Sequence, residues 1–279
     1  MMTHPPVRRL ELLARIGFAA RGVVYCLVGG LAALAAIGSG GGVGGGKSAL
    51  RSVLEQPFGA VLLLAIGAGL VCFAAWRVIG AAFDADGRGR SAKARATRAL
   101  QAVSGVVYLG LAATAANLAL GRGGGGAEDQ MAQDWTEWLM AQPAGAWLVG
   151  AIGLGLIAGG LAYGWKAWKG DVMRRLAPPP GATDWVRHVG RAGYAARALT
   201  FVIIGGFVVT AALHADSDEV RGLGGALQAL RGQPYGWALL FLTAAGLFAF
   251  GFFGLVQARY RRIDTPDLAD AKALLSRRA

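Results

Sequence analysis

Charged residues are scarce in this chain of 279 residues. Only 16% of the residues are Asp, Glu, Lys or Arg, whereas 55% are hydrophobic. A soluble globular protein has about a quarter of its residues charged, so this composition excludes an ordinary soluble fold. Six windows carry no charge at all: Gly22–Ile37, Phe58–Trp76, Ala99–Gly121, Ala144–Trp165, Ala198–Leu213 and Tyr235–Ala258. Because a helix of about 20 apolar residues crosses a bilayer, these windows predict six transmembrane helices.

Residues that bind metals or perform acid–base chemistry are equally few. The chain has three histidines and two cysteines, without Cys-x-x-Cys, His-x-x-x-His or Glu-x-x-His spacing. Cys26 and Cys72 lie inside apolar windows, which favours packing over a disulfide. The windows also hold no carboxylate, whereas a proton-coupled transporter usually has one there. We therefore expect no metal, no cofactor and no enzymatic activity.

What the chain has instead is a repeated segment. ARIGFAARGVVY at 14–25 returns as TRALQAVSGVVY at 97–108 and as GRAGYAARALTF at 190–201. Each copy leads into an apolar run, a break, a Gln-Pro-x-Gly corner and a second apolar run. The corner dipeptides are Gln56-Pro57, Gln142-Pro143 and Gln233-Pro234, where proline suits the first turn of a new helix. The pattern predicts an all-α polytopic membrane protein, with six transmembrane helices as three tandem two-helix repeats related by pseudo-threefold symmetry.

The breaks between apolar runs set the expected boundaries. Short amphipathic helices are predicted before each corner, at the outer interface. The predicted organisation is an N-terminal tail at 1–9, repeats at 10–83, 97–169 and 187–260, cytoplasmic linkers at 84–96 and 170–186, and a C-terminal amphipathic tail at 261–279.

Basic residues are distributed unevenly across these breaks. The segments on one side of the spans hold 23 of the 28 Lys and Arg, giving a net charge of +15 there against −3 on the other side. This asymmetry follows the positive-inside rule and places both termini in the cytoplasm. The net charge of +12 therefore reports membrane topology, and we expect no nucleic-acid partner.

Five arginines recur within the repeats. Arg15, Arg98 and Arg191 are equivalent in all three copies, while Arg21 and Arg197 recur in two, with Ser104 at the third position. We expect Arg21 and Arg197 to lie at the inner edge of the membrane and to reach toward the headgroups. The guanidinium fork suits a lipid phosphate, so all five are predicted headgroup-binding residues. The alternative is that they only anchor the helix ends.

The repeated segment with its paired second helix resembles the bacterial family called domain of unknown function 1206. The resemblance covers about Leu10 to Tyr260. It is specific in the first and third copies and weaker in the second, where Leu100 and Ser104 depart from the pattern. It implies three two-helix membrane units in a bacterial cytoplasmic membrane, and it implies no activity.

Two classes of function fit these features. The leading hypothesis is a non-enzymatic scaffold, accessory subunit or lipid-organising component, with anionic lipids, a membrane-protein partner or a second copy of the chain as partners. The alternative is a channel or facilitator for a small neutral or weakly polar solute along the pseudo-threefold axis. The polar residues available to line such a path are Ser104, Thr114, Asn117, Thr200, Thr210 and Thr243.

Overall fold

The computed structural model describes residues 5–83, 91–122, 128–173 and 176–261, and their regular structure is helical. Six long helices are α1 (Pro5–Ala36), α3 (Gly59–Phe83), α4 (Ala92–Ala119), α6 (Gly145–Lys169), α7 (Thr183–His214) and α9 (Gly236–Tyr260). Three shorter helices are α2 (Gly46–Leu54), α5 (Glu128–Met140) and α8 (Leu223–Arg231). Single 3₁₀ turns occur at Asp171–Met173, Pro180–Ala182 and Ser217–Glu219.

The six long helices are long and apolar enough to cross a membrane. This confirms the predicted all-α polytopic class with six spans, and α2, α5 and α8 are the predicted helices before the corners. Several helices begin earlier than expected: α1 starts at Pro5, α4 at Ala92 and α7 at Thr183. The predicted tail beyond Arg261 and linker residues 84–90 lie outside the described part of the chain.

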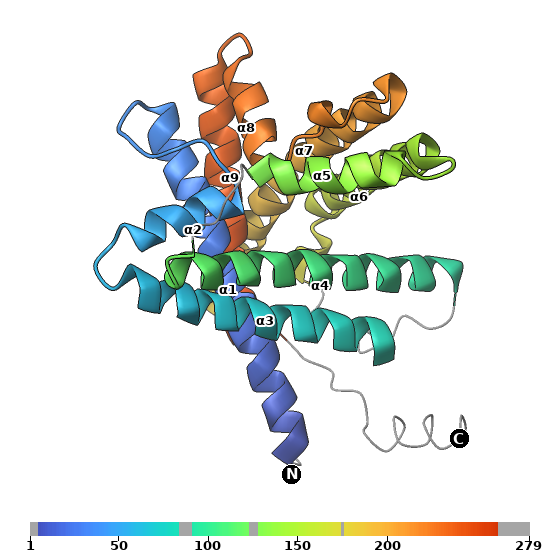
Figure 1. Ribbon diagram of the computed structural model, residues 1–279. Helices are drawn as coiled ribbons and strands as arrows, with labels where there is room; N and C mark the ends of the chain where they lie inside the picture. Colours follow the sequence, from blue (N-terminus) through green and yellow to red (C-terminus); the bar gives the residue numbers. More distant parts are fainter. Residues whose placement is uncertain (1–4, 84–90, 123–127, 174–175, 262–279) are drawn as a thin grey trace.

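The long helices pair across repeat boundaries. As Figure 1 shows, α3 packs along α4, α6 packs along α7, and α9 packs along α1. Each pair joins the second span of one repeat to the first span of the next, and the third repeat closes the cycle on the first. Such cyclic pairing is what a threefold arrangement of repeats requires, although the axis itself stays a prediction.

Packing within a repeat differs among the three copies. The spans of the first repeat, α1 and α3, pack together, as do α7 and α9 in the third, but α4 and α6 are barely in contact. Glycines permit the two close contacts. A Cβ atom on Gly17 would lie 2.6 Å from the Phe73 backbone, and one on Gly193 would lie 2.6 Å from the Phe250 backbone. The middle repeat has Leu100 at the equivalent position, and its helices separate.

The Gln-Pro-x-Gly corners share one backbone conformation. Their third residues, Phe58, Ala144 and Tyr235, all have a positive φ near 60°. In the first corner the Gly59 N–H donates to the Gln56 carbonyl at 2.9 Å, closing a turn with proline at its second position. A Cβ on the glycine would lie 2.4 Å from a carbonyl oxygen of α2, which explains the final glycine.

The short helices do not all lie in the same environment. Leu50 of α2 and Leu227 of α8 are fully buried, so the apolar faces of these two helices pack on the bundle. Their predicted place at the outer interface stays a prediction. In contrast, Trp135 and Trp138 of α5 are mostly exposed, as expected for an interfacial helix. The middle repeat is again the one that is less tightly packed.

Candidate functional site: a buried arginine–aromatic cluster

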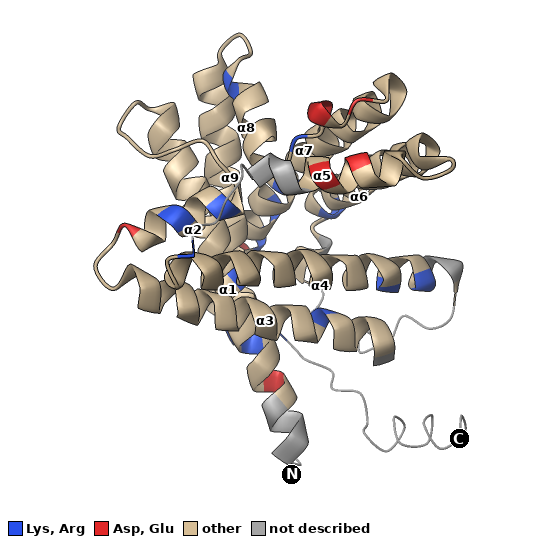
Figure 2. Ribbon diagram, in the orientation of Figure 1, with Lys and Arg blue, Asp and Glu red and all other residues tan. Residues whose placement is uncertain are grey.

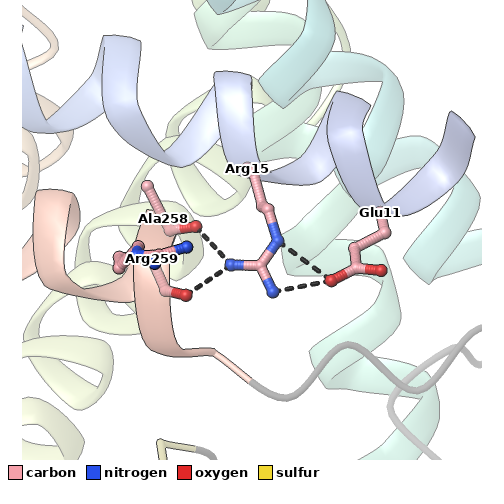
Figure 3. Close-up of polar contacts among 4 residues, drawn as sticks. All are labelled: Glu11, Arg15, Ala258 and Arg259. Atoms are coloured by element: carbon pink, nitrogen blue, oxygen red, sulfur yellow. Dashed lines mark hydrogen bonds and ion pairs between the residues drawn. The ribbon is translucent and has the colours of Figure 1, made fainter. Parts of the chain in front are cut away.

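Arg15 holds the end of a neighbouring span. Figure 3 shows its guanidinium between α1 and the last turn of α9. The Nη1 atom donates to the carbonyls of Ala258 at 2.7 Å and Arg259 at 2.5 Å. The Nε and Nη2 atoms bind a Glu11 carboxylate oxygen at 3.0 and 2.6 Å. The arginine therefore satisfies carbonyls that the end of a helix leaves without partners, at its negative dipole end.

The equivalent arginines of the other repeats make the same contact. Arg98 donates to the carbonyls of Ala81 at 2.5 Å and Ala82 at 2.8 Å, at the end of α3. Arg191 donates to those of Ala167 at 2.8 Å and Trp168 at 3.4 Å, at the end of α6. Each first span is thus tied to the span with which it pairs. This geometry is that of the helix-anchoring alternative, while headgroup binding by these three residues stays a prediction.

Arg21 lies deeper on α1 and faces the interior of the bundle. Six residues separate it from Arg15, a rise of about 9 Å along the helix. Its side chain is only 7% exposed, and Nη2 donates to the Gln257 side-chain oxygen at 3.1 Å. The expectation that it reaches outward to the headgroups is therefore wrong. The guanidinium is drawn inward by Gln257 and by the faces of Phe73 and Phe250, 5.1 and 5.0 Å from its central carbon.

Arg197 occupies the matching position on α7 and also turns inward. It donates through Nη1 to the Tyr25 hydroxyl of α1. Its central carbon lies 4.5 Å from the Phe201 ring, 5.0 Å from Phe250 and 5.7 Å from Tyr163. The Phe250 ring therefore contacts both guanidinium groups, with the central carbons of Arg21 and Arg197 each 5.0 Å from its centre.

A third arginine, Arg77 of α3, completes the cluster and is not among the predicted site residues. It directly follows the second charge-free window, so the charge pattern alone places it with the basic residues of the cytoplasmic side. The Phe73 ring lies 5.2 Å from its central carbon and also contacts Arg21. Because Arg77 stands five residues before Ala82, it lies about 8 Å from the end of its span, a depth close to that of Arg21 and Arg197. That depth is the signal that would have identified it.

No carboxylate neutralises these three arginines within the part of the chain that the structure describes. Figure 2 shows the described acidic residues near helix ends, in short connections and on the short helix α5. The buried Nε atoms of Arg21, Arg77 and Arg197 all lack a hydrogen-bond partner. Arg21 shares the Phe73 ring with Arg77 and the Phe250 ring with Arg197, so the three cations lie close together. Unit charges about 10 Å apart repel by about 2 kcal/mol at an effective dielectric of 20, so the cluster is electrostatically unfavourable by itself.

Aromatic side chains surround the three cations. The rings of Tyr25 on α1 and Tyr163 on α6 lie 4.9 and 5.7 Å from the Arg197 central carbon, and Tyr108 of α4 packs edge-on against Phe73 with ring centres 4.7 Å apart. Each cation–π contact stabilises by about 0.5–2 kcal/mol, which offsets part of the desolvation of the guanidinium groups. All six spans contribute to this arginine–aromatic cluster, which we define as Arg21, Arg77, Arg197 and the rings of Tyr25, Phe73, Tyr108, Tyr163, Phe201 and Phe250.

Other predicted polar features are used locally. The hydroxyls of Thr114, Thr200 and Thr210 donate to carbonyls of their own helices. Cys26 and Cys72 are free thiols. The described residues contain no group of three or more His, Cys, Asp or Glu side chains that could hold a metal ion. The guanidinium and hydroxyl groups of the cluster are hydrogen-bond donors of the kind that can bind negative charge.

Comparison with known proteins places the chain in a family. The sequence profile described as Domain of Unknown Function (DUF1206) matches three segments, residues 16–84, 99–170 and 192–261. The chain belongs to the DUF1206 family. It is 33% identical over 264 residues to the Bacillus subtilis (strain 168) protein described as uncharacterized protein YxxB, covering 94% of each chain. No solved structure matches it. The three DUF1206 segments correspond to the three repeats and confirm the resemblance seen in the sequence.

Proposed function

We propose that this DUF1206 protein is a non-enzymatic membrane component that binds an oxyanion, of the phosphate class, in the arginine–aromatic cluster. The observation that carries the proposal is that Arg21, Arg77 and Arg197 lie together inside the bundle with buried Nε donors that have no partner. An ionisable residue inside a membrane span marks a functional site by default, and three of one sign call for a counter-charge. This extends the lipid-organising hypothesis and moves its centre from the helix ends to the interior.

The donor set favours an oxyanion over a simple halide. A guanidinium presents parallel N–H groups that match two oxygens of one phosphate or carboxylate. Tyr25 and Tyr163, which lie beside Arg197, add hydroxyl groups of the kind that donate to such oxygens. The cluster residues include no histidine, Asp or Glu beside these donors, so binding rather than turnover is the proposed role.

The proposed location is the bacterial plasma membrane, with both termini in the cytoplasm. The net charge of +15 on one side of the spans supports this orientation. The contact of Arg15 with the end of α9 brings the first and last spans together at that side. The cluster then lies about 9 Å inside the membrane from the cytoplasmic helix ends, within reach of a headgroup or an anion from the cell interior.

Thermal unfolding of purified Arg77→Gln tests the proposal. Arg77 is the best choice because it forms no hydrogen bond within the described structure. In buffer poor in oxyanions, we expect the variant to be more stable than the wild type, since one like charge is removed at a cost of only one cation–π contact. Inorganic phosphate should then stabilise the wild type more than chloride does at equal ionic strength, and should stabilise the variant much less.

Arg51→Gln is the matched control. Arg51 is an exposed cation of α2 that takes no part in the cluster, so this variant should respond to phosphate as the wild type does. Identical phosphate responses in the wild type and in Arg77→Gln would contradict oxyanion binding at this centre.

A further inference from the structure

The middle repeat leaves open a side of the bundle that the other repeats close. In the first repeat, Gly69 of α3 packs so closely on α1 that its Cβ would lie 2.4 Å from the Cβ of Ala20. In the third repeat the equivalent Gly246 would lie 2.5 Å from the Cβ of Ala196. The middle repeat has Gly155 and Val103 at these positions. A Cβ on Gly155 would meet nothing within 4 Å, and Val103 is 61% exposed.

The second closing contact is lost at the same place. Phe73 and Phe250 fill the space over Gly17 and Gly193 in the outer repeats. In the middle repeat the large and the small residue change places. Leu100 stands on α4 where the outer repeats have glycine, and Gly159 stands on α6 where they have phenylalanine. Leu100 is 61% exposed and does not close the gap. Leu100 and Val103 on α4 and Gly155 on α6 thus do not close the α4–α6 contact, and a Cβ on Gly159 would meet only the Phe201 ring of α7, at 3.8 Å. We call this place the α4–α6 opening, defined by Leu100, Val103, Gly155 and Gly159.

The opening leads toward the arginine–aromatic cluster. Tyr163 follows Gly159 by one turn on α6, and its ring lies 5.7 Å from the Arg197 guanidinium carbon. Tyr163 and Arg197 are both only partly buried, unlike Phe73 and Phe250. Lys166 lies one turn further along α6, exposed, with its ammonium 5.7 Å from the Tyr163 ring. Cationic groups therefore extend from the cytoplasmic end of α6 into the cluster.

We infer that the occupant of the α4–α6 opening is an anionic phospholipid, which enters sideways from the bilayer. Its phosphate reaches Arg197 and its neighbours, and its acyl chains lie between the apolar faces of α4 and α6. Two features together select a lipid over a free anion. The opening is lined by Leu100, Val103 and Gly155, whose apolar surfaces favour an acyl chain. It ends at cationic groups, which favour a phosphate. This inference depends on the proposed function, because it names the source of the oxyanion.

Closing the opening tests the inference. Leu100→Gly with Gly159→Phe installs the pair that closes the outer repeats. Purified from vesicles of phosphatidylcholine with a minority of phosphatidylglycerol, the wild type should retain phosphatidylglycerol selectively, as measured by native mass spectrometry. The double variant should retain about tenfold less, since its lateral path is filled. Its stabilisation by inorganic phosphate should persist, because the double variant retains Arg21, Arg77 and Arg197.

A second variant guards against a folding defect in the first. Val103→Trp places bulk in the opening from an exposed position, and it should also lower phosphatidylglycerol retention. Leu109→Trp, exposed on another face of α4, is its control and should leave retention unchanged. Equal retention in the wild type and in both closing variants would overturn lateral access. If Arg77→Gln also left the phosphate response unchanged, the proposed binding site itself would be wrong. If Arg77→Gln lost the phosphate response while the closing variants retained phosphatidylglycerol like the wild type, only the lipid inference would be rejected.

Discussion

The middle repeat and the two outer repeats share a sequence pattern but pack differently. All three contain the corner with a positive φ, the arginine that holds a neighbouring helix end, and a short helix before the corner. Only the outer two bring their own spans together. The difference depends on few side chains, because Gly17 and Gly193 are replaced by Leu100, and Phe73 and Phe250 by Gly159. A repeat can therefore keep its helices and lose the contact between its two spans when glycine and a large apolar residue change places at two facing positions.

The same comparison explains where the cations gather. The first and third copies contribute Arg21 and Arg197, whereas the middle copy has Ser104. The position of Arg77 on α3 corresponds to Tyr163 on α6 and to Gly254 on α9. Three equivalent positions thus hold a cation, a ring with a hydroxyl and no side chain at all. The cluster is therefore asymmetric, with its least covered side toward the middle repeat.

The largest effect on stability is expected when the leucine of the middle repeat is introduced at the equivalent glycine of an outer repeat. Gly17→Leu or Gly193→Leu forces a side chain into a space where even a Cβ lies 2.6 Å from backbone. We expect each to lower the free energy of unfolding by about 3 kcal/mol, because backbone cannot move aside as a side chain can. Unfolding in mixed micelles measures this.

The reverse exchange is the control. Leu100→Gly removes an exposed side chain from a helix. It should lower the free energy of unfolding by only about 1 kcal/mol, which is the difference in helix propensity between leucine and glycine. If Gly17→Leu were no more destabilising than Leu100→Gly, the account of the packing difference would fail.

A smaller effect is expected for the feature that all three repeats share. Replacing Arg15, Arg98 or Arg191 by Met removes charge-assisted hydrogen bonds to carbonyls at a helix end. We expect each change, including that of Arg98 in the middle repeat, to lower the free energy of unfolding by about 1–2 kcal/mol. Arg95→Met, an exposed cation on the same helix as Arg98, should be close to neutral. A neutral Arg98→Met beside costly Arg15→Met and Arg191→Met would show that the middle repeat also lacks this contact.

Much of the fold could be predicted from the sequence, because it depends on local signals. Charge-free runs of about 20 residues fix the spans, and the recurring Gln-Pro-x-Gly fixes the corners. The pairing of α9 with α1 could not be read from such signals, since it depends on contacts between the two ends of the chain. Residue equivalence did point to Leu100 and Ser104 as departures. Their consequence, an unpacked α4–α6 face, required the neighbouring positions in space.

The candidate site was only partly predictable for a similar reason. Arg21 and Arg197 were identified by recurrence, but an arginine near the end of a span can turn toward headgroups or toward the interior. Periodicity does not decide between these directions. Rings from three other helices decide it, through Phe73, Phe250 and Tyr163. Arg77 carries no recurrence at all, so composition alone assigned it to the basic cytoplasmic side.

Disulfide cross-linking at the three equivalent positions tests the central claim most directly. Three double-cysteine variants are made in a background with Cys26→Ala and Cys72→Ala. They carry cysteines at positions 20 and 69, at positions 103 and 155, and at positions 196 and 246. Disulfides form only between residues whose Cβ atoms can be brought to about 4 Å. The first and third pairs lie in direct contact, with Cβ atoms at 2.4 and 2.5 Å before the helices move apart to admit the added side chains, so these two pairs should form on mild oxidation in membranes. The middle pair should remain reduced. Formation of all three at equal rates would contradict an open middle repeat.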